Sequence, residues 1–283
     1  MRIPSSDLII NQDGSIYHLG LQPGELAPLI ITVGDPDRVP LVSQYFDEID
    51  FKTFRREFVT HTGRIGNKKI SVLSTGMGTD NIDIVLNEID ALFNIDFESK
   101  QIKKQLTSLK IIRLGTSGTI QQDIPLGSIL ASELAIDYDG LLSFYELPPH
   151  RFSNFKLPLL NNRKAFIAPS SELLLDTIAK EYIKGITYTA VGFYAPQGRL
   201  LRAKPSLPNL LDQLRRISFP KNRKITNIEM ETSGLYGLGH ILGHEMLSIS
   251  VILADRVNGK FLQQPEKAIQ NMLEDCLEKI TTL

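Results

Sequence analysis

The sequence has few cysteines and no long hydrophobic run. Its single cysteine, Cys276, excludes an intramolecular disulfide. No window approaches the roughly 18 apolar residues that a membrane-spanning helix needs. The first residues, MRIPSSDLII, also lack the charged-then-apolar layout of a secretory signal. These absences lead us to expect a cytoplasmic protein with no membrane partner.

An excess of charge of either sign is also missing. The 283 residues include 31 Lys and Arg against 32 Asp and Glu, which gives a net charge of −1. Such a chain has no overall basic field that would attract nucleic acid, so any phosphate must be bound by local groups. The hydrophobic share of 42% is enough for a large buried core in a folded protein.

Short β-branched runs alternate with helical stretches and predict an α/β fold. The predicted strands lie at 29–34, 70–76, 111–118, 128–134, 186–194 and 247–255. Apolar spacing predicts helices over 81–93 and 171–183, the second with Ser171 as its N-cap. The polar, lysine-rich stretch 94–110 is expected to be an exposed helical insertion, and 146–160 an irregular segment.

Three strand ends run into glycine-rich turns, namely VGDPDRV (33–39), STGMG (74–78) and RLGTSG (113–118). Each alone could be an ordinary tight turn, the first stabilised by Asp35 and Arg38. Arg113, however, lies in an apolar strand and needs an anion. Together the turns predict a phosphate site without a metal, and neither GxxxxGK[ST] nor GxGxxG occurs.

Paired carboxylates and paired histidines are the other candidates for chemistry. Glu229 and Glu231 flank Met230, which suits either acid and base in glycoside hydrolysis or a carboxylate that holds ribose hydroxyls. His240 and His244 have the i, i+4 spacing of metal ligands, but no third ligand is evident. We therefore expect ordinary helix histidines and predict no metal site.

In order along most of the chain, these motifs resemble the nucleoside phosphorylase family, in particular its uridine phosphorylase branch. The resemblance rests on YHLGL (17–21), GDPDRV (34–39), RREF (55–58), STGMG, RLGTSGTI (113–120), GFYAPQGR (192–199), EMETSGL (229–235) and LADRV (253–257). It implies one phosphorylase-type α/β domain over 1–283, with a distorted mixed central sheet flanked by helices. It also implies a homodimer with shared sites, which in this family often assembles further into a hexamer.

The resemblance assigns roles to individual residues. The implied phosphate ligands are Gly34, Arg38, Arg56, Arg113 and Thr116, with Arg56 supplied by the neighbouring subunit. The implied ribose ligands are His18, Met230 and Glu231, with His18 again from the neighbour. The implied base ligands are Gly118, Phe193, Gln197 and Arg199, with Arg256 supporting the Gln–Arg pair. Glu229 is expected to be a structural or supporting carboxylate rather than a direct substrate contact. Asp255 is expected to have a structural role beside Arg256.

The implied activity is phosphate-dependent cleavage of uridine to uracil and ribose 1-phosphate, with inorganic phosphate as co-substrate and no cofactor. The Gln197-x-Arg199 spacing fits the acceptor, donor and acceptor along the edge of uracil. The alternatives are a purine nucleoside phosphorylase or nucleosidase of the same fold, and a nucleoside-binding protein without turnover. In some members a glutamate matching Glu57 helps to hold a monovalent cation. Asn81 replaces the serine of that site, which counts against potassium here.

Overall fold

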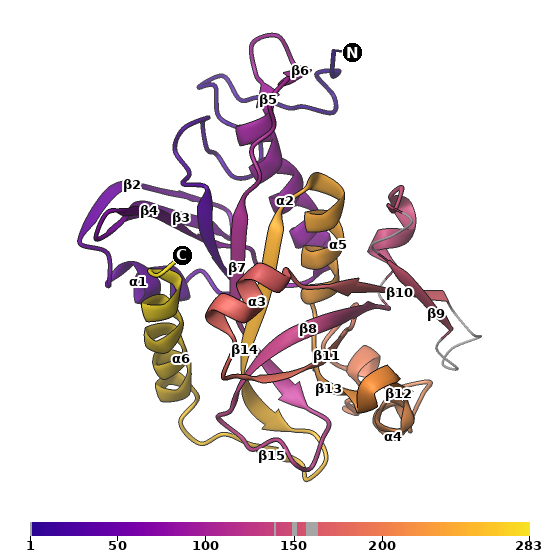
Figure 1. Ribbon diagram of the computed structural model, residues 1–283. Coiled ribbons are helices and arrows are strands. Elements are labelled where there is room, and N and C mark those ends of the chain that lie inside the picture. Colours follow the sequence, from indigo (N-terminus) through magenta and orange to yellow (C-terminus); the bar gives the residue numbers. More distant parts are fainter. Residues whose placement is uncertain (1, 139, 149–151, 157–163) are drawn as a thin grey trace.

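A mixed β-sheet forms the centre of the molecule in the computed structural model, which describes residues 2–138, 140–148, 152–156 and 164–283 (Figure 1). Four of its strands run parallel: β1 (Leu29–Val33), β4 (Lys68–Ser74), β7 (Lys110–Thr119) and β14 (Glu245–Asp255). Ile31 of β1 lies opposite Val72 on one side and Ile112 on the other. The carboxyl ends of these strands therefore meet at one edge.

The remaining strands extend both sides of this parallel core. On one side, β2 (Glu48–Arg55) and β3 (Phe58–Ile65) form an antiparallel hairpin next to β4. The other strands are β8 (Ile129–Asp137), β9 (Ser153–Lys156), β10 (Lys164–Pro169), β11 (Ile183–Thr189), β12 (Ser218–Phe219), β13 (Arg223–Glu229) and β15 (Lys260–Phe261). This distorted mixed sheet, flanked by helices, is the predicted fold class.

Five strands close into a ring. In the sheet order, β13, β11, β8, β14 and β7 are successive neighbours, and β13 also pairs antiparallel with the end of β7. Asn227 lies opposite Thr119 and Ile228 opposite Gly118. This closure brings the glycine-rich end of β7 next to the segment that carries the paired glutamates.

Successive residues of a strand point to opposite sides of the sheet, so the apolar central strands present hydrophobic side chains on both faces. Helices cover both of these faces. Ile31 packs in the hydrophobic cluster with α1 (Arg38–Ser43), α3 (Glu172–Ile178) and α6 (Pro265–Ile280). Its neighbour Ile30 packs in the cluster with α2 (Thr79–Asn94) and α5 (Thr232–Leu242). A shorter helix, α4 (Leu210–Arg216), packs against β13.

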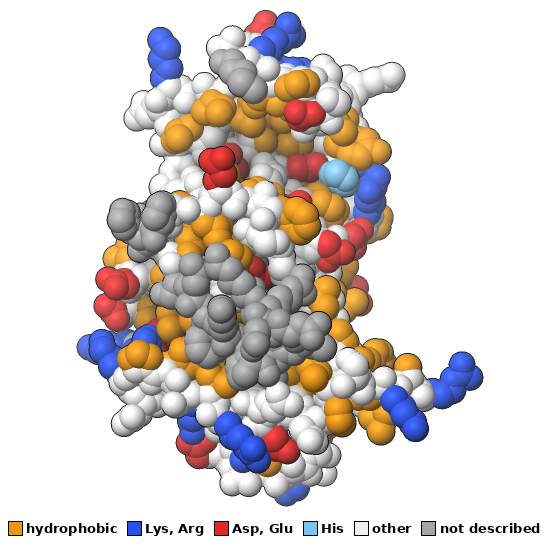
Figure 2. Space-filling model, turned by 90° about the vertical axis from the view of Figure 1, so that its right-hand side faces the viewer, with side chains coloured by type: hydrophobic (Ala, Val, Ile, Leu, Met, Phe, Trp, Pro, Cys, Tyr) orange, Lys and Arg blue, Asp and Glu red, His pale blue; other side chains and the backbone are white. Residues whose placement is uncertain are grey.

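Hydrophobic and charged side chains of both signs share the molecular surface. On the face shown in Figure 2, orange hydrophobic side chains are interspersed with blue and red charged ones. Within the described ranges, none of the helices has the length and apolar character that crossing a bilayer requires.

The predicted strands and helices are present with shifted ends. Each of the six predicted strand segments overlaps an observed strand, and 81–93 lies within α2. Ser171 is the N-cap of α3, where its hydroxyl accepts a hydrogen bond from the Leu174 N–H at 3.2 Å. This helix ends at Ile178 rather than 183, because the chain turns there and β11 begins at Ile183.

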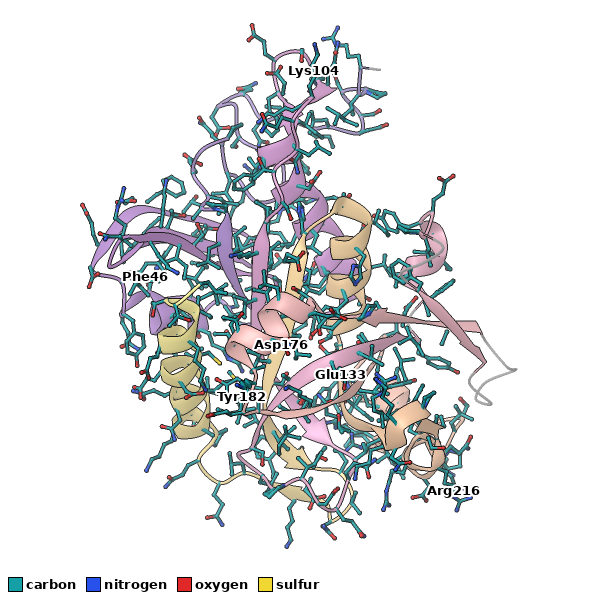
Figure 3. All side chains as sticks on the ribbon, viewed as in Figure 1. Phe46, Lys104, Glu133, Asp176, Tyr182 and Arg216 are labelled. Carbon is teal, nitrogen blue, oxygen red and sulfur yellow. The ribbon has the colours of Figure 1, made fainter. Side chains whose placement is uncertain are left out.

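The prediction of a helical insertion over 94–110 was wrong. Instead, β5 (Ile95–Asp96) and β6 (Gln101–Ile102) form a small hairpin. The Asn94 side chain ends α2 and closes the base of this segment by accepting from the Thr107 N–H at 2.7 Å and donating to its carbonyl at 3.2 Å. Lys104 lies at the distal end of the molecule beside the hairpin (Figure 3).

The segment 146–160, expected to be irregular, is described only in part. The structure shows the strand β9 within it, at Ser153–Lys156. The parts at 149–151 and 157–160 lie outside the described residues.

Candidate active site

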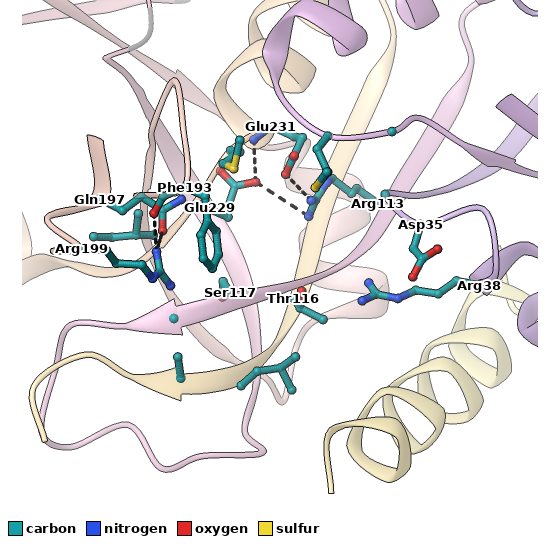
Figure 4. A pocket seen from close by; sticks show the side chains of 18 of the residues that line it. Asp35, Arg38, Arg113, Thr116, Ser117, Phe193, Gln197, Arg199, Glu229 and Glu231 are labelled. Atoms are coloured by element: carbon teal, nitrogen blue, oxygen red, sulfur yellow. Dashed lines mark hydrogen bonds and ion pairs between the residues drawn. The ribbon is translucent and has the colours of Figure 1, made fainter. Parts of the chain in front are cut away.

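A cavity of about 580 Å³ opens where β1, β4, β7, β13 and β14 come together (Figure 4). Ligands of α/β proteins commonly bind at such an edge, where strands end and backbone groups become free. The cavity is lined by Gly34, Asp35, Pro36, Arg38, Glu57, Gly76, Met77, Arg113, Thr116, Ser117, Gly118, Phe193, Gln197, Arg199, Ile228, Glu229, Met230, Glu231, Leu253, Ala254 and Phe261.

The structure gathers most of the predicted site residues around this one cavity. From the phosphate set these are Gly34, Arg38, Arg113 and Thr116; from the ribose set, Met230 and Glu231; from the base set, Gly118, Phe193, Gln197 and Arg199. Glu229 also lines the cavity. His18, Arg56, Asp255 and Arg256 do not line it.

Arg113 has hydrogen-bond donors to spare although it is almost fully buried, with 4% of its surface exposed. Its Nη2 donates to Glu231, and its Nη1 lies 3.8 Å from a carboxylate oxygen of Glu229. Within the described part of the chain, Nη1 and Nε have no hydrogen-bond acceptor. Gly115 makes room for this group, because a Cβ there would overlap the guanidinium. These free buried donors suit an anion.

Arg38 provides a second cationic group at the same end of the cavity (Figure 4). Burial lowers the pKa of Arg38, Asp35 opposes that shift, and the positive charge of Arg113 adds to it. Two guanidinium groups that disfavour each other's charge are both stabilised by an anion between them. The end of the cavity formed by Arg38 and Arg113 therefore has the positive charge that binding an anion requires.

Glu231 lies in the middle of the cavity, at the start of α5, with its carboxylate held from two sides. One oxygen accepts the Gly78 N–H at 2.7 Å, and the other accepts from Arg113. Gly78 precedes α2 with a φ of 92°, a conformation that favours glycine. The loop after β4, the strand β7 and helix α5 thus position one carboxylate together.

Glu229 is engaged with the protein on several sides. Its carboxylate accepts from the Thr189 hydroxyl at 2.7 Å and from the backbone N–H groups of Glu231 and Thr232 at 3.0 and 2.9 Å. Burial raises the pKa of Glu229, an effect that the charge of Arg113 opposes. The bonds to the first residues of α5 give Glu229 a supporting position behind Glu231.

The other end of the cavity is formed by the loop from Phe193 to Arg199. A short 3₁₀ turn at Ala195–Gln197 ends at Gly198, whose φ is 68°. Arg199 donates to the side-chain oxygen of Gln197 and, at 2.8 Å, to the Phe193 carbonyl. Its guanidinium carbon lies 3.7 Å from the centre of the Phe193 ring. Gln197, only 3% exposed, is thereby fixed with its amide NH₂ still available.

The guanidinium groups of Arg199 and Arg256 interact at this end. Burial lowers the pKa of Arg199 to about 10, and the charge of Arg256 adds to that shift. Gly118 allows Arg256 to pass close, because a Cβ there would lie 3.1 Å from Cγ of Arg256. This end of the cavity is therefore rich in positive charge, which would stabilise a negatively charged group.

Asp255 has a structural role in the turn that follows β14. Its carboxylate accepts from the N–H groups of Val257 and Asn258 at 2.9 and 3.0 Å and from the Asn258 amide at 2.7 Å. Across the described residues, no ion pair joins it to Arg256. Asp255 stabilises the turn that follows β14, because its short side chain reaches the backbone two and three residues ahead.

His18 and Arg56 lie together on a surface outside the cavity. The Arg56 guanidinium carbon is 5.4 Å from the centre of the Tyr17 ring, and the Tyr17 and His18 rings are 4.7 Å apart. Arg56 is exposed at the turn between β2 and β3, with a φ of 56° that is unusual for a residue other than glycine. The adjacent Glu57 lines the cavity.

Several cavity residues were not predicted as contacts. Ser117, Leu253 and Ala254 lie inside predicted strands, and alternation along those strands was the only signal available for them. Met77 and Phe261 are 74% and 63% exposed, so they form an apolar part of the rim. Their contribution depends on the fold, because Phe261 reaches the cavity through the pairing of β15 with β14.

The paired histidines have protein partners. His240 Nε2 lies 2.8 Å from the Pro169 carbonyl. His244 Nδ1 accepts from the Leu109 N–H at 3.3 Å, and its Nε2 lies 3.3 Å from Asp90. A search of the described residues finds no cluster of metal-ligating side chains.

Comparison with known proteins identifies the family of the chain. Residues 28–282 match the sequence model of the Phosphorylase superfamily, and the chain belongs to this family. It is 31% identical over 262 residues to the uridine phosphorylase of Thermococcus kodakarensis, covering 90% of this chain and 83% of the relative. It is 23% identical to a purine nucleoside phosphorylase (DeoD-type) of Buchnera aphidicola, covering 94% and 99%.

A solved structure extends the similarity to three dimensions. The nucleoside phosphorylase of Trypanosoma brucei, described as showing uridine phosphorylase activity, superimposes with a TM-score of 0.87 at 29% identity. The match covers 98% of this chain and all of the other. Relatives with both pyrimidine and purine names thus share the family, so the choice of base depends on the cavity itself.

Proposed function

We propose that this protein is a uridine phosphorylase, which cleaves uridine with inorganic phosphate to uracil and ribose 1-phosphate. One observation carries the proposal: a single cavity has the guanidinium groups of Arg38 and Arg113 at one end, a fixed carboxylate in the middle and a Gln–Arg pair at the other (Figure 4). The 31% identical uridine phosphorylase and the 29% identical structure support the same activity.

Phosphate would bind between Arg38 and Arg113. The Nη1 and Nε donors of Arg113 make no hydrogen bond within the described chain, and a phosphate oxygen would supply an acceptor. Thr116 and the turn at Gly34 line the same region. Held there, the nucleophile meets the sugar in a set orientation, which replaces a random encounter in solution.

Ribose would occupy the middle of the cavity. Each oxygen of Glu231 already accepts one hydrogen bond and can accept another from a ribose hydroxyl. Met230 lines the cavity next to it and would pack against the sugar. In this position the sugar lies between the phosphate and the base.

Uracil would be read by Gln197 and Arg199. The bond from Arg199 leaves the Gln197 amide NH₂ to donate to O2, and the oxygen of the same amide can accept from N3–H. Arg199, which has only donors, suits O4. Cytosine would present an amino donor to these donors, a mismatch that costs several orders of magnitude in discrimination.

The same residues would promote bond cleavage. As the glycosidic bond lengthens, negative charge grows on the departing base and positive charge on the sugar. Arg199, with Arg256 close behind it, would stabilise the anionic base electrostatically, so no strong general acid is needed. The purine alternative would call on an acid near Asp255, whose carboxylate is occupied by the turn at Val257 and Asn258.

The sites would be shared between two subunits of a homodimer. His18 and Arg56 lie outside their own cavity, and the unusual backbone at Arg56 presents its side chain on the surface. The exposed apolar rim at Met77, Phe193 and Phe261 is the kind of surface that a partner covers. We further propose a single domain over 1–283 and a cytoplasmic location, while assembly into hexamers stays a prediction.

The proposal is tested by one assay across uridine, thymidine, cytidine, inosine and adenosine, with and without inorganic phosphate. We expect uridine to be cleaved to uracil and ribose 1-phosphate only when phosphate is present. Free ribose formed at an equal rate in phosphate-free buffer would instead indicate a nucleosidase. Faster cleavage of inosine or adenosine would favour the purine alternative.

Replacing Gln197 with alanine should impair the binding of uridine far more than the binding of phosphate. The change removes only the amide at the base end and leaves Arg38 and Arg113 in place. We expect the Michaelis constant for uridine to rise about tenfold or more, the scale of one buried hydrogen bond, with that for phosphate nearly constant. The measurement is of initial rates over a grid of uridine and phosphate concentrations. An equal rise of the Michaelis constants for uridine and phosphate would contradict the assignment of Gln197 to the base.

A further inference from the structure

One carboxylate holds both the backbone and the ring of His18. Glu88, on α2, accepts from the His18 N–H at 3.0 Å and from the Leu19 N–H at 2.9 Å. The same carboxylate lies 2.6 Å from His18 Nδ1. Both side chains are largely buried, with 13% of Glu88 and 27% of His18 exposed. These bonds fix where the imidazole lies and how it is turned.

The contact also decides which ring nitrogen carries the proton. An ionised carboxylate can only accept, so the proton of a neutral His18 lies on Nδ1, where it is donated to Glu88. Nε2 then has a lone pair and accepts a hydrogen bond from a donor such as a hydroxyl. If the proton moved to Nε2, the imidazole would present a donor instead.

The packing around His18 supports the same orientation. The Tyr17 ring meets the imidazole nearly edge-on, with an angle of 80° between the planes. The Tyr17 ring also lies close to the guanidinium of Arg56, the residue proposed to reach a partner's phosphate. The cluster of Tyr17, His18, Arg56 and Glu88 thus carries both side chains that the partner's cavity lacks.

We propose that Glu88 is a positioning residue, which fixes the tautomer and orientation of His18 so that Nε2 accepts from the 5′-hydroxyl of a nucleoside in the partner's cavity. This inference rests on the proposed function and its shared sites. Glu88 itself would not touch substrate. It would set the selectivity of the enzyme for nucleosides that carry a 5′-hydroxyl.

The test compares uridine with 5′-deoxyuridine, which lacks the group that His18 would read. In Glu88→Gln the charge that holds the Nδ1 proton is lost, and the Michaelis constant for uridine should rise about tenfold. The Michaelis constant for 5′-deoxyuridine should stay nearly constant. The preference of the enzyme for uridine over 5′-deoxyuridine should therefore be largely lost. A loss of protein stability alone would lower the activity on both substrates to the same extent. An unchanged preference in folded Glu88→Gln would overturn the proposal.

Asp90→Asn provides a matched control. Asp90 lies on the same helix and also faces a histidine, with its Oδ1 3.3 Å from His244 Nε2, but it is not part of the cluster around His18. This variant should keep the wild-type preference for uridine. A collapse as large as that in Glu88→Gln would show that any damage to α2 has this effect, and would overturn the assignment to Glu88.

A measurement on the unmodified protein covers the case in which Glu88→Gln does not fold. Long-range ¹⁵N–¹H correlation spectra of the histidine rings, with His18 assigned through His18→Asn, report the tautomer directly. We expect Nδ1–H for neutral His18, and an Nε2–H tautomer would overturn the proposal. A wild type that fails to cleave uridine would instead refute the proposed function while leaving this tautomer measurable.

Discussion

Replacing Arg113 with alanine should reduce uridine cleavage by about a hundredfold or more, the scale expected when one preorganised charged donor is lost. Arg113 is the buried cation of the proposed phosphate site, and its Nη1 and Nε have no hydrogen-bond partner within the described chain. Its loss should also raise the Michaelis constant for phosphate. Steady-state rates at varied phosphate and fixed uridine would show both effects.

The same change should destabilise the fold. Glu231 bonds to Arg113 and Glu229 lies close to it, so alanine leaves two buried carboxylates without their cation. Breaking such a pair typically costs about 3–5 kcal/mol. Urea unfolding must therefore accompany the kinetics. Arg223→Ala is a suitable control, because Arg223 pairs with Glu133 at 3.0 Å outside the cavity. A normal rate in folded Arg113→Ala would leave Arg113 with only a structural role.

Mixing two inactive variants should restore activity if the sites are shared. Arg56→Ala and Arg113→Ala are each expected to be nearly inactive as pure proteins. In a mixed dimer, one site would hold both lesions and the other none, because a two-fold interface is reciprocal. Random pairing makes about half of the dimers mixed, so about a quarter of all sites would be intact. Activity after joint unfolding and reassembly should return to roughly that fraction of wild type.

The control for this experiment is each variant unfolded and reassembled alone, which should stay inactive. The presence of mixed dimers can be verified with a different affinity tag on each variant. If tagged mixed dimers form but remain as inactive as either parent, the two arginines do not serve one composite site. Arg56 would then act within its own subunit, or would not bind substrate.

The fold could be predicted where strands are buried on both faces. The runs LIITV and IIRLG are buried at every position and apolar except at Thr32 and Arg113, because helices cover both sides of β1 and β7. The insertion at 94–110 could not be predicted in this way. Its shape depends on the Asn94 side chain, which bonds the backbone of Thr107 and ends α2. A long-range bond of this kind leaves no periodic signal in the sequence.

The candidate site also contains some residues that could be predicted from the sequence and others that could not. Arg113 could be found because an arginine within an apolar strand needs an anion, and Gln197 because it lies in a recognisable motif. Glu88 could not be found, since it lies 70 residues from His18 in sequence and looks like any polar residue of an amphipathic helix. Apolar residues of the rim, such as Phe261, were missed because an exposed hydrophobic residue can be assigned to a binding site only when the position of the cavity is known.

The ring of strands β7, β8, β11, β13 and β14 couples ligand binding to folding. Arg113 and Glu231 are 118 residues apart and meet where β13 pairs with the end of β7. Closing such a long loop carries an entropic cost, which contacts within the ring must offset. An open ring would separate the residues of the proposed site. Any ligand of this cavity therefore binds the closed form alone and, by mass action, stabilises the whole ring in proportion to the logarithm of its concentration.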